Sequence, residues 1–273
     1  METLFLEPYT ILLIAGFIGF FMAFGIGAND VANSMGTSVG SKAITIKQAI
    51  IIAAIFEFLG AFLAGGEVTS TIRKGIVDPE LYVDETNIFV IGMLSALLAG
   101  GTWLYVASLR GWPVSTTHTI VGSIVGFVLI TKGVDAVSWG KVGNIAMSWV
   151  TSPLFSGTLA FGLYISAKKL ILDRSNPGEA AIRYIPFYSF LVAVVISLVT
   201  ARKGLKHVGV EFTDNEVYLF IAIFGSLVGL ATAFFLRRNK QQIMRDGGIE
   251  FAFGLLMVVS ASAMAFAHGS NDV

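Results

Sequence analysis

The sequence predicts an all-α membrane protein: a polytopic helical bundle with inverted-topology repeats and with broken or half helices at the middle of the bilayer. Three observations lead to it: an apolar composition, long segments almost free of charge, and a polar motif that occurs twice. Of the 273 residues, 55% are hydrophobic and 13% are charged, and the mean hydropathy is +0.78. A soluble domain carries about 25% charged residues, so too little polar surface remains here to cover one. The formal net charge of +0 gives no electrostatic support to nucleic-acid binding.

The apolar segments have the length that a membrane crossing needs. A helix rises about 1.5 Å per residue, so ~20 apolar residues cross the hydrocarbon core. We predict eight membrane segments with ends accurate to a few residues: 9–40, 48–65, 88–109, 113–131, 144–167, 185–201, 217–236 and 248–273. The segment 113–131 is either a full crossing or a re-entrant hairpin, and the orientation below assumes a crossing.

Lys and Arg residues predict the orientation, because they concentrate in cytoplasmic loops. The loops 168–183 and 237–245 are both basic and two crossings apart, so one orientation makes both cytoplasmic. Counting back puts the N-terminus outside, in a plasma (inner) membrane. Arg202, Lys203 and Lys206 then lie outside, which counts mildly against this scheme.

A repeated motif predicts the architecture. Residues 18–31 and 260–273 share seven of fourteen aligned positions, including Gly-x-Asn-Asp-Val. The two copies lie an odd number of crossings apart and therefore have opposite orientations, as in inverted-repeat transporters, whose substrate site lies near the bilayer midplane. The domain prediction is a first repeat at 1–172, connecting helices with two spans at 173–245, and the incomplete start of a second repeat at 246–273.

The first copy of the motif lies in the middle of an apolar stretch. As one helix, residues 9–40 would be ~48 Å long, well beyond the ~30 Å hydrocarbon core, so we expect a break at Gly25 and Gly27. An ionised carboxylate at the bilayer centre costs about 2.5–3.5 kcal/mol or more, which indicates that Asp30 and Asp272 are functional. The alternative is that Asp30 caps the second half-helix.

A second motif follows a short polar turn. Pro113 suits the first turn of a helix, and Ser115, Thr116 and Thr117 follow it. Hydroxyls and free N–H groups at a helix N-terminus form an anion site, and hydroxyl oxygens also suit a sodium ion. The alternative is ordinary hydrogen bonding between membrane helices. A lone histidine in such a position, His118 here or His268 in the second copy, more often packs or hydrogen-bonds.

An intramembrane acid and several glycines complete the pattern. Glu57 lies inside the second span and is a candidate for coupling or gating. It binds a cation, carries a proton, or pairs with a donor of a neighbouring helix. Gly36-x-x-x-Gly40 and Gly122-x-x-x-Gly126 predict faces where helices approach closely.

The acids suggest how transport is coupled. If Asp30 and Asp272 share one site with the hydroxyls, a bare anion there is strongly repelled. Anion binding then requires cations or protonated carboxylates, so each ion makes the site tolerable for the other. The arrangement implies anion–cation symport, although a cation substrate would need no such partner. The Gly140-Lys141 pair is followed by Val142, so no phosphate loop of the ATPase type is present, and transport would depend on an ion gradient.

These motifs resemble the inorganic phosphate transporter family. The resemblance rests on Gly27–Ser34, Gly36-Thr37, Ile55–Glu57, Thr71–Ile76, Pro113–Thr119 and His268–Val273. It implies a homodimeric secondary transporter that imports phosphate with sodium, or with protons in other branches. It also implies a phosphate–cation cluster between the two motifs. The implied phosphate-binding residues are Asp30, Asn33, Ser115, Thr116, Thr117 and Asp272, and the implied sodium ligands are Asn29, Asp30, Asn33, Ser115, Thr117, Asn271 and Asp272.

The remaining expectations concern partners and alternatives. We expect no enzyme activity, no cofactor other than sodium ions as co-substrate, and inorganic phosphate, Na+ (or H+) and the lipid bilayer as partners. The alternatives are a proton-coupled phosphate or metal-phosphate symporter, a cation transporter or channel on the same fold, and a non-transporting membrane receptor. Since the family continues beyond its second signature, we expect that this chain is part of a longer transporter.

Overall fold

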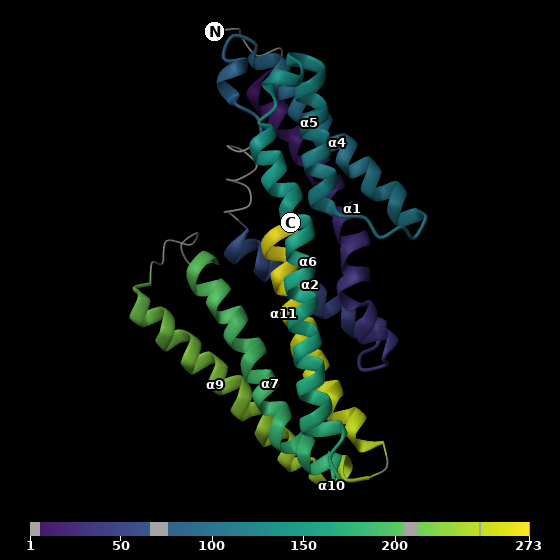
Figure 1. The fold of residues 1–273 in the computed structure, drawn as a ribbon. Helices are drawn as coiled ribbons and strands as arrows, with labels where there is room; N and C mark the ends of the chain where they lie inside the picture. Colours follow the sequence, from purple (N-terminus) through teal and green to yellow (C-terminus); the bar gives the residue numbers. More distant parts are fainter. Residues whose placement is uncertain (1–5, 66–75, 205–211, 246, 273) are drawn as a thin grey trace. The chain divides into compact units, whose positions relative to one another are not determined.

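The computed structural model describes residues 6–65, 76–204, 212–245 and 247–272, and within these ranges the side chains of Ala64, Lys203, Gly204 and Asp272 are left out (Figure 1). The signature segment Thr71–Ile76 therefore lies outside the described residues apart from its last position, Ile76. The regular elements in chain order are α1 (Pro8–Gly40), α2 (Ile46–Ala64), the 3₁₀ turn η1 (Pro79–Tyr82), α4 (Thr86–Leu109), α5 (Thr116–Lys132), the 3₁₀ turn η2 (Val134–Ala136), α6 (Trp139–Ala167), the π turn η3 (Lys168–Leu172), α7 (Pro177–Val199), the π turn η4 (Thr200–Gly204), α9 (Asp214–Arg238), α10 (Lys240–Ile243) and α11 (Gly248–Asp272).

All eight predicted apolar segments are helices in the structure. Seven helices among the described residues are long and apolar enough to cross a membrane, and α5, with 17 residues, is shorter. Most of α6 is exposed apolar surface, with Phe155 74% exposed. In a helix with no buried residue, such side chains are suited to contact with lipid or other helices.

The predicted break in the first segment is wrong. Helix α1 runs without interruption for 33 residues. The glycine expected to break it instead lets α4 approach, because a Cβ at Gly25 would lie 3.1 Å from Leu104 Cβ and 3.4 Å from Gly101 O. Met22, Ile26 and Leu104 form the buried contact beside this position. Gly25 is therefore a packing residue within a regular helix.

The packing faces predicted at Gly36–Gly40 and Gly122–Gly126 have no helix against them among the described residues. Apart from each glycine's chain neighbours and the nearby backbone of its own helix, no described atom lies within 4 Å of a Cβ built at any of the four. Close helix contacts use other glycines, such as Gly60 on α2 against Phe266 and Gly229 on α9 against Phe190. A small-residue spacing marks a surface that permits close approach, and the packing decides whether a helix is there.

The described residues form two compact units. The first contains residues 1–33, 67–150 and 272–273, and the second contains 34–66 and 151–271. Helices α1 and α6 each contribute to both. The predicted repeat boundaries at 172 and 246 remain a prediction.

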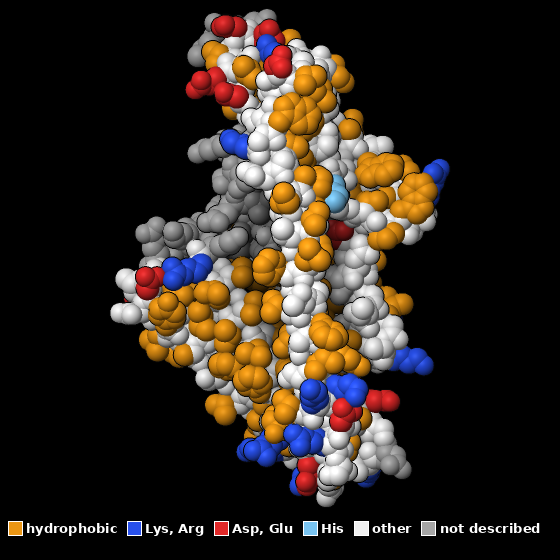
Figure 2. Space-filling model, in the orientation of Figure 1, with side chains coloured by type: hydrophobic (Ala, Val, Ile, Leu, Met, Phe, Trp, Pro, Cys, Tyr) orange, Lys and Arg blue, Asp and Glu red, His pale blue; other side chains and the backbone are white. Residues whose placement is uncertain are grey.

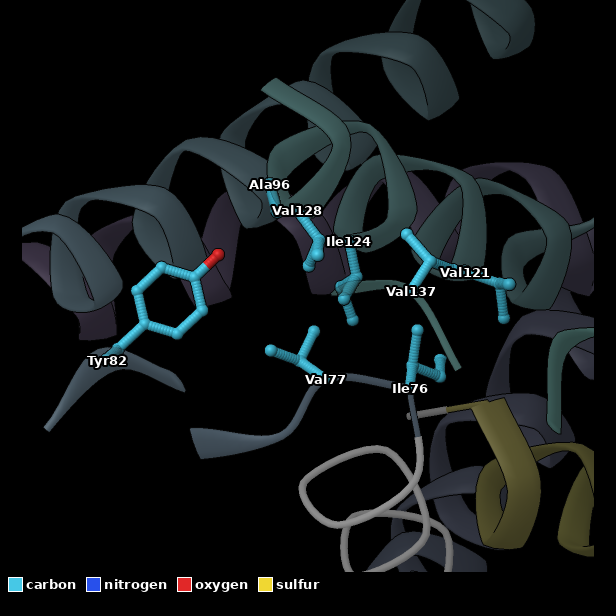
Figure 3. Packing of buried hydrophobic residues seen from close by; sticks show 8 residues of the cluster. All are labelled: Ile76, Val77, Tyr82, Ala96, Val121, Ile124, Val128 and Val137. Atoms are coloured by element: carbon cyan, nitrogen blue, oxygen red, sulfur yellow. The ribbon is translucent and has the colours of Figure 1, made fainter. Parts of the chain in front are cut away.

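The core of the first unit lies between α4, α5 and the segment before α4. Figure 3 shows Ile76 and Val77 of that segment pointing towards Ile124 and Val128 of α5, with Tyr82 of η1 beside them. The Tyr82 hydroxyl lies 2.6 Å from Thr131 Oγ1. Lys132, at the end of α5, forms a 2.9 Å ion pair with Glu85, just before α4. Helix α5 therefore returns to the end of the unit where α4 begins.

The second unit contains the antiparallel pair α7 and α9, which lie side by side in Figure 1. Helix α7 starts eight residues before the predicted span, because Asn176 caps its first turn by accepting a 3.2 Å hydrogen bond from Glu179 N, and Pro177 follows the cap. Tyr188 of α7 lies 2.7 Å from the Ser166 hydroxyl of α6. Arg202 forms a 2.8 Å ion pair with Asp214, so an acid partly neutralises one of the three cations that argued against the predicted orientation.

Candidate functional site

The candidate site of the first unit is the place where α1 meets the loop before α5. Helix α4 ends at the C-cap Arg110, and Gly111 follows with φ +66°. Trp112 N donates to Ala107 O at 2.9 Å and Gly111 N to Ser108 O at 3.1 Å, which is the Schellman arrangement that favours glycine. The loop then turns through Pro113 towards α5.

The hydroxyl motif begins α5, slightly later in the chain than predicted. Ser115 is the N-cap and accepts a 3.2 Å hydrogen bond from His118 N, and Thr116 is the first helical residue. Pro113 therefore lies in the loop before the cap, and not in the first turn. The prediction that hydroxyls gather at a helix N-terminus is confirmed.

Asn29 holds this loop against α1. Its side-chain Nδ2 donates to Trp112 O at 2.9 Å, and its Oδ1 accepts from Val114 N at 3.2 Å. The residue is only 5% exposed. Because Trp112 and Val114 lie between the end of α4 and the start of α5, the Trp112 carbonyl and the Val114 amide have no helical partners, and one carboxamide satisfies both. The carbonyl oxygen of Asn29 keeps a second lone pair, and its predicted role as a sodium ligand remains a prediction.

Asp30 faces the first residue of α5. The Thr116 hydroxyl donates a hydrogen bond to Asp30 Oδ2, and Thr116 is buried while Asp30 is half-buried. A carboxylate near a helix N-terminus is stabilised by the positive end of the helix dipole. Asp30 thus sits at the end of another helix and does not cap a half-helix of its own segment.

The other predicted residues of this unit are more open. Ser115, Thr117 and Asn33 are exposed. Asn33 follows Asp30 by three positions on α1, a spacing that puts side chains on one helix face. Beside α5, a cleft of about 300 Å³ is lined by residues of α4 and α5, among them Trp103, His118, Thr119 and Ser123. The Thr119 and Ser123 hydroxyls donate to Ser115 O and Thr119 O of their own helix, both at 2.9 Å.

His118 packs as expected for a lone histidine. Its ring centroid lies 3.7 Å from that of Trp149 on α6. Sequence reasoning did not single out Trp149, because nothing in the spacing of α6 relates it to α5.

The acid of the second span pairs with a histidine of the second motif. Glu57 Oε1 lies 3.1 Å from His268 Nδ1, and both side chains are 12% exposed. Three roles were predicted for Glu57, and the structure shows the third of them, a pairing with a group on a neighbouring helix. Gly269 brings the helices together there, since a Cβ at Gly269 would overlap the backbone of Glu57. The expectation that His268 hydrogen-bonds is confirmed.

The rest of the second motif has local contacts. Asn271 Nδ2 donates to Ala267 O of its own helix at 2.8 Å, and Asn271 is exposed. The side chain of Asp272 is outside the description. The proximity of Asp30 and Asp272 therefore remains a prediction, as do the phosphate and sodium roles of all the residues named in the sequence analysis.

Comparison with known proteins agrees with these features. A candidate phosphate permease of Haemophilus influenzae is 51% identical over 265 residues, which are 95% of this chain and 63% of that protein. A candidate phosphate permease of Pyrococcus abyssi is 40% identical over 98% of this chain and 65% of its own length. The Arabidopsis thaliana protein named inorganic phosphate transporter 2-1, chloroplastic, is 39% identical over 93% of this chain and 47% of its own.

A solved structure agrees as well. The protein described as the sodium-dependent phosphate transporter matches with a TM-score of 0.89 and 38% sequence identity, over 96% of this chain and 64% of the other. This chain thus spans less than two thirds of the length of these relatives. The profile of the phosphate transporter family matches residues 26–273. This integral membrane protein belongs to the phosphate transporter family, a family of transporters and not of enzymes.

Proposed function

We propose that the protein imports inorganic phosphate by symport with sodium ions, at a site near the bilayer midplane where the two inverted repeats meet. The observation that carries this proposal is the hydrogen bond from Thr116 to Asp30, at the start of α5. It joins the acid of the first motif to the hydroxyl motif, in a chain of the phosphate transporter family.

The charge of Asp30 explains why a cation is needed. The N-terminus of α5 attracts anions, but the carboxylate already faces it. Two unit charges 4 Å apart interact by ~4 kcal/mol at an effective dielectric constant of about 20, so phosphate beside Asp30 is repelled unless a cation lies between. Sodium binding would lower that repulsion, and phosphate would in turn strengthen sodium binding. The matching solved structure is described as sodium-dependent, which supports sodium as the coupling ion.

The proposed ligands follow from exposure and chemistry. Ser115, Thr117 and Asn33 are exposed near Asp30 and Thr116 and offer hydroxyl and amide groups. Asn29 would position the loop and contribute its carbonyl oxygen to sodium. Asn271 and Asp272 would bring the equivalent groups of the second repeat.

Proton coupling is the second candidate, and the Glu57–His268 pair favours it. A carboxylate and an imidazole in contact hold one proton between them with no net charge, and release of that proton leaves one negative charge on the pair, which uptake of a proton from the other side removes. In this version Glu57 is the coupling residue and phosphate, or metal-phosphate, enters with protons.

Further proposals concern the assembly and its setting. The transporter would be a homodimer in the plasma membrane with its N-terminus outside. The orientation is supported by the fact that Arg174 and Arg183 lie around the same pocket as Arg237 and Lys240, so the two basic loops are at one end of the second unit.

The test is radiolabelled phosphate uptake into vesicles that contain the protein in its complete native form. Uptake is measured with and without an inward sodium gradient at equal pH, and then with a pH gradient alone. Sodium-dependent uptake is expected. Uptake driven only by the pH gradient would replace sodium with protons, and no uptake under either gradient would reject phosphate and favour a cation transporter or channel.

A further inference from the structure

A basic pocket lies at one end of the second unit, remote in sequence from both motifs. It has a volume of about 620 Å³ and lies between the start of α7, the end of α9 and the start of α10. Among the described residues, four cationic side chains line it against a single carboxylate, that of Glu179. Figure 2 shows Lys and Arg side chains gathered at the end of this unit where Figure 1 labels α10. The cationic residues are Arg174, Arg183, Arg237 and Lys240.

The positive charge of this pocket is largely uncompensated. Glu179 lies 3.5 Å from Lys240 Nζ, an exposed ion pair. In the part of the chain that the structure describes, no carboxylate lies within ion-pair distance of Arg174, Arg183 or Arg237. Arg183 instead stacks over the ring of Tyr184 at 5.5 Å. Guanidinium groups bind phosphate oxygens in a bidentate manner, so three such groups around one pocket suit a phosphate ester.

The rest of the pocket lining includes apolar side chains. Ile182 and Pro186 of α7 and Ala233 of α9 contribute to it, on the two helices that also carry Arg183 and Arg237. Further along these helices the exposed side chains are apolar, such as Phe187 at 53% and Phe234 at 68%. A free phosphate ion would use only the charged part, whereas a phospholipid would use both.

The position of the pocket at the end of an apolar helix also fits a lipid. The apolar run of α9 ends at Leu236 and is followed at once by Arg237 and Arg238. Basic residues at this point of a membrane helix lie at the level of the lipid headgroups. This end is the one predicted to be cytoplasmic, and anionic lipids are abundant in the cytoplasmic leaflet.

We propose that the pocket binds an anionic phospholipid. The guanidinium groups of Arg174, Arg183 and Arg237 hold the phosphodiester, and an acyl chain lies along Ile182, Pro186 and Ala233. The pocket shares no residue with the proposed transport site, and the proposal does not depend on which ion is transported.

The test measures retained lipid by native mass spectrometry on the purified, detergent-solubilised protein, titrated with phosphatidylglycerol or phosphatidylcholine. A charge near an anionic headgroup contributes about 1 kcal/mol, a factor of roughly five in affinity. R183Q/R237Q is therefore expected to bind phosphatidylglycerol more than about tenfold more weakly. The matched control R238Q/R245Q removes two exposed charges that do not line the pocket and is expected to bind as the unchanged protein does.

Two further variants test the two parts of the site. R183K/R237K keeps the charge but loses the bidentate geometry, so it is expected to bind phosphatidylglycerol more tightly than R183Q/R237Q and less tightly than the unchanged protein. Ala233→Trp fills the apolar part and is expected to weaken phosphatidylglycerol binding while all four cationic residues remain. Gel filtration of each variant identifies any that fails to fold.

Three results would overturn the proposal, and two of them need no variant. The first is equal binding of phosphatidylcholine and phosphatidylglycerol. The second is displacement of the lipid by millimolar inorganic phosphate, which would indicate a site for the free ion. The third is equal weakening of binding in R183Q/R237Q and R238Q/R245Q, which would indicate diffuse surface charge.

Discussion

The carboxamide of Asn29 lies between the two residues that flank Pro113, donating to the carbonyl of Trp112 and accepting from the amide of Val114. The next residue, Asp30, accepts a hydrogen bond from Thr116. These neighbours therefore have different tasks: Asn29 fixes the backbone of the loop, and Asp30 presents a charge at the start of α5. A regular helix turns about 100° per residue, which is why adjacent positions reach two parts of the same motif.

Asn29→Ala is expected to destabilise the protein. It removes two hydrogen bonds to the loop backbone, each worth about 0.5–1.5 kcal/mol, so a loss of about 1–3 kcal/mol is expected. Thermal unfolding in detergent measures it. Asn33→Ala, at an exposed position of the same helix, serves as the control, and equal unfolding temperatures for the two variants would contradict the loop-holding role.

Asp30→Asn is expected to abolish phosphate uptake while the protein still inserts and folds. The amide oxygen continues to accept from Thr116, but the negative charge that attracts the cation is lost. Uptake in vesicles and the unfolding temperature are measured together. Unchanged uptake would remove Asp30 from the transport site.

At the scale of the elements, glycines decide how closely helices pack. Gly60 and Gly269 lie where α2 and α11 meet, and Gly269 lies against the backbone of Glu57. The contact holds the Glu57 and His268 side chains within 3.1 Å. The glycine spacings visible in the sequence, at Gly36–Gly40 and Gly122–Gly126, are not the ones that this packing uses.

Gly269→Ala is expected to push α11 away from α2. Overpacking at a close contact costs about 1–3 kcal/mol, which is seen as a lower unfolding temperature. Gly254→Ala on the same helix is the matched control, because a Cβ there meets nothing within 4 Å among the described residues. It is expected to be neutral or slightly stabilising, since alanine favours a helix by up to about 1 kcal/mol over glycine. Equal destabilisation by both substitutions would count against this packing account.

At the scale of the molecule, the orientation depends on whether α5 crosses the membrane. The ion pair between Lys132 and Glu85 puts the end of α5 beside the start of α4, as an antiparallel pair requires. This geometry favours a return crossing, so that loops at the two ends of these helices lie on opposite sides.

Cysteine labelling tests this orientation directly, because the sequence contains no cysteine. Single cysteines at the exposed positions Asp84 and Asp135 are expected to react with a membrane-impermeant maleimide added outside intact cells. Cysteines at Ser175 and Gln241 are expected to react only after the membrane is opened. Labelling of Asp135 from the inside alone, with Asp84 still labelled from the outside, would make 113–131 a re-entrant hairpin.

The sequence by itself determined the membrane class, the eight apolar helices and the polar motifs, because composition, helix length and caps are local properties of the chain. One local signal was overlooked: Asn176 followed by Pro177 is a typical helix start, yet the predicted span began at residue 185. Only the tertiary structure decided that α1 is unbroken at Gly25, that Asp30 faces Thr116, and that Glu57 pairs with His268. These depend on which helix surfaces meet and how closely they approach, and a one-dimensional pattern specifies an apolar face without specifying its partner.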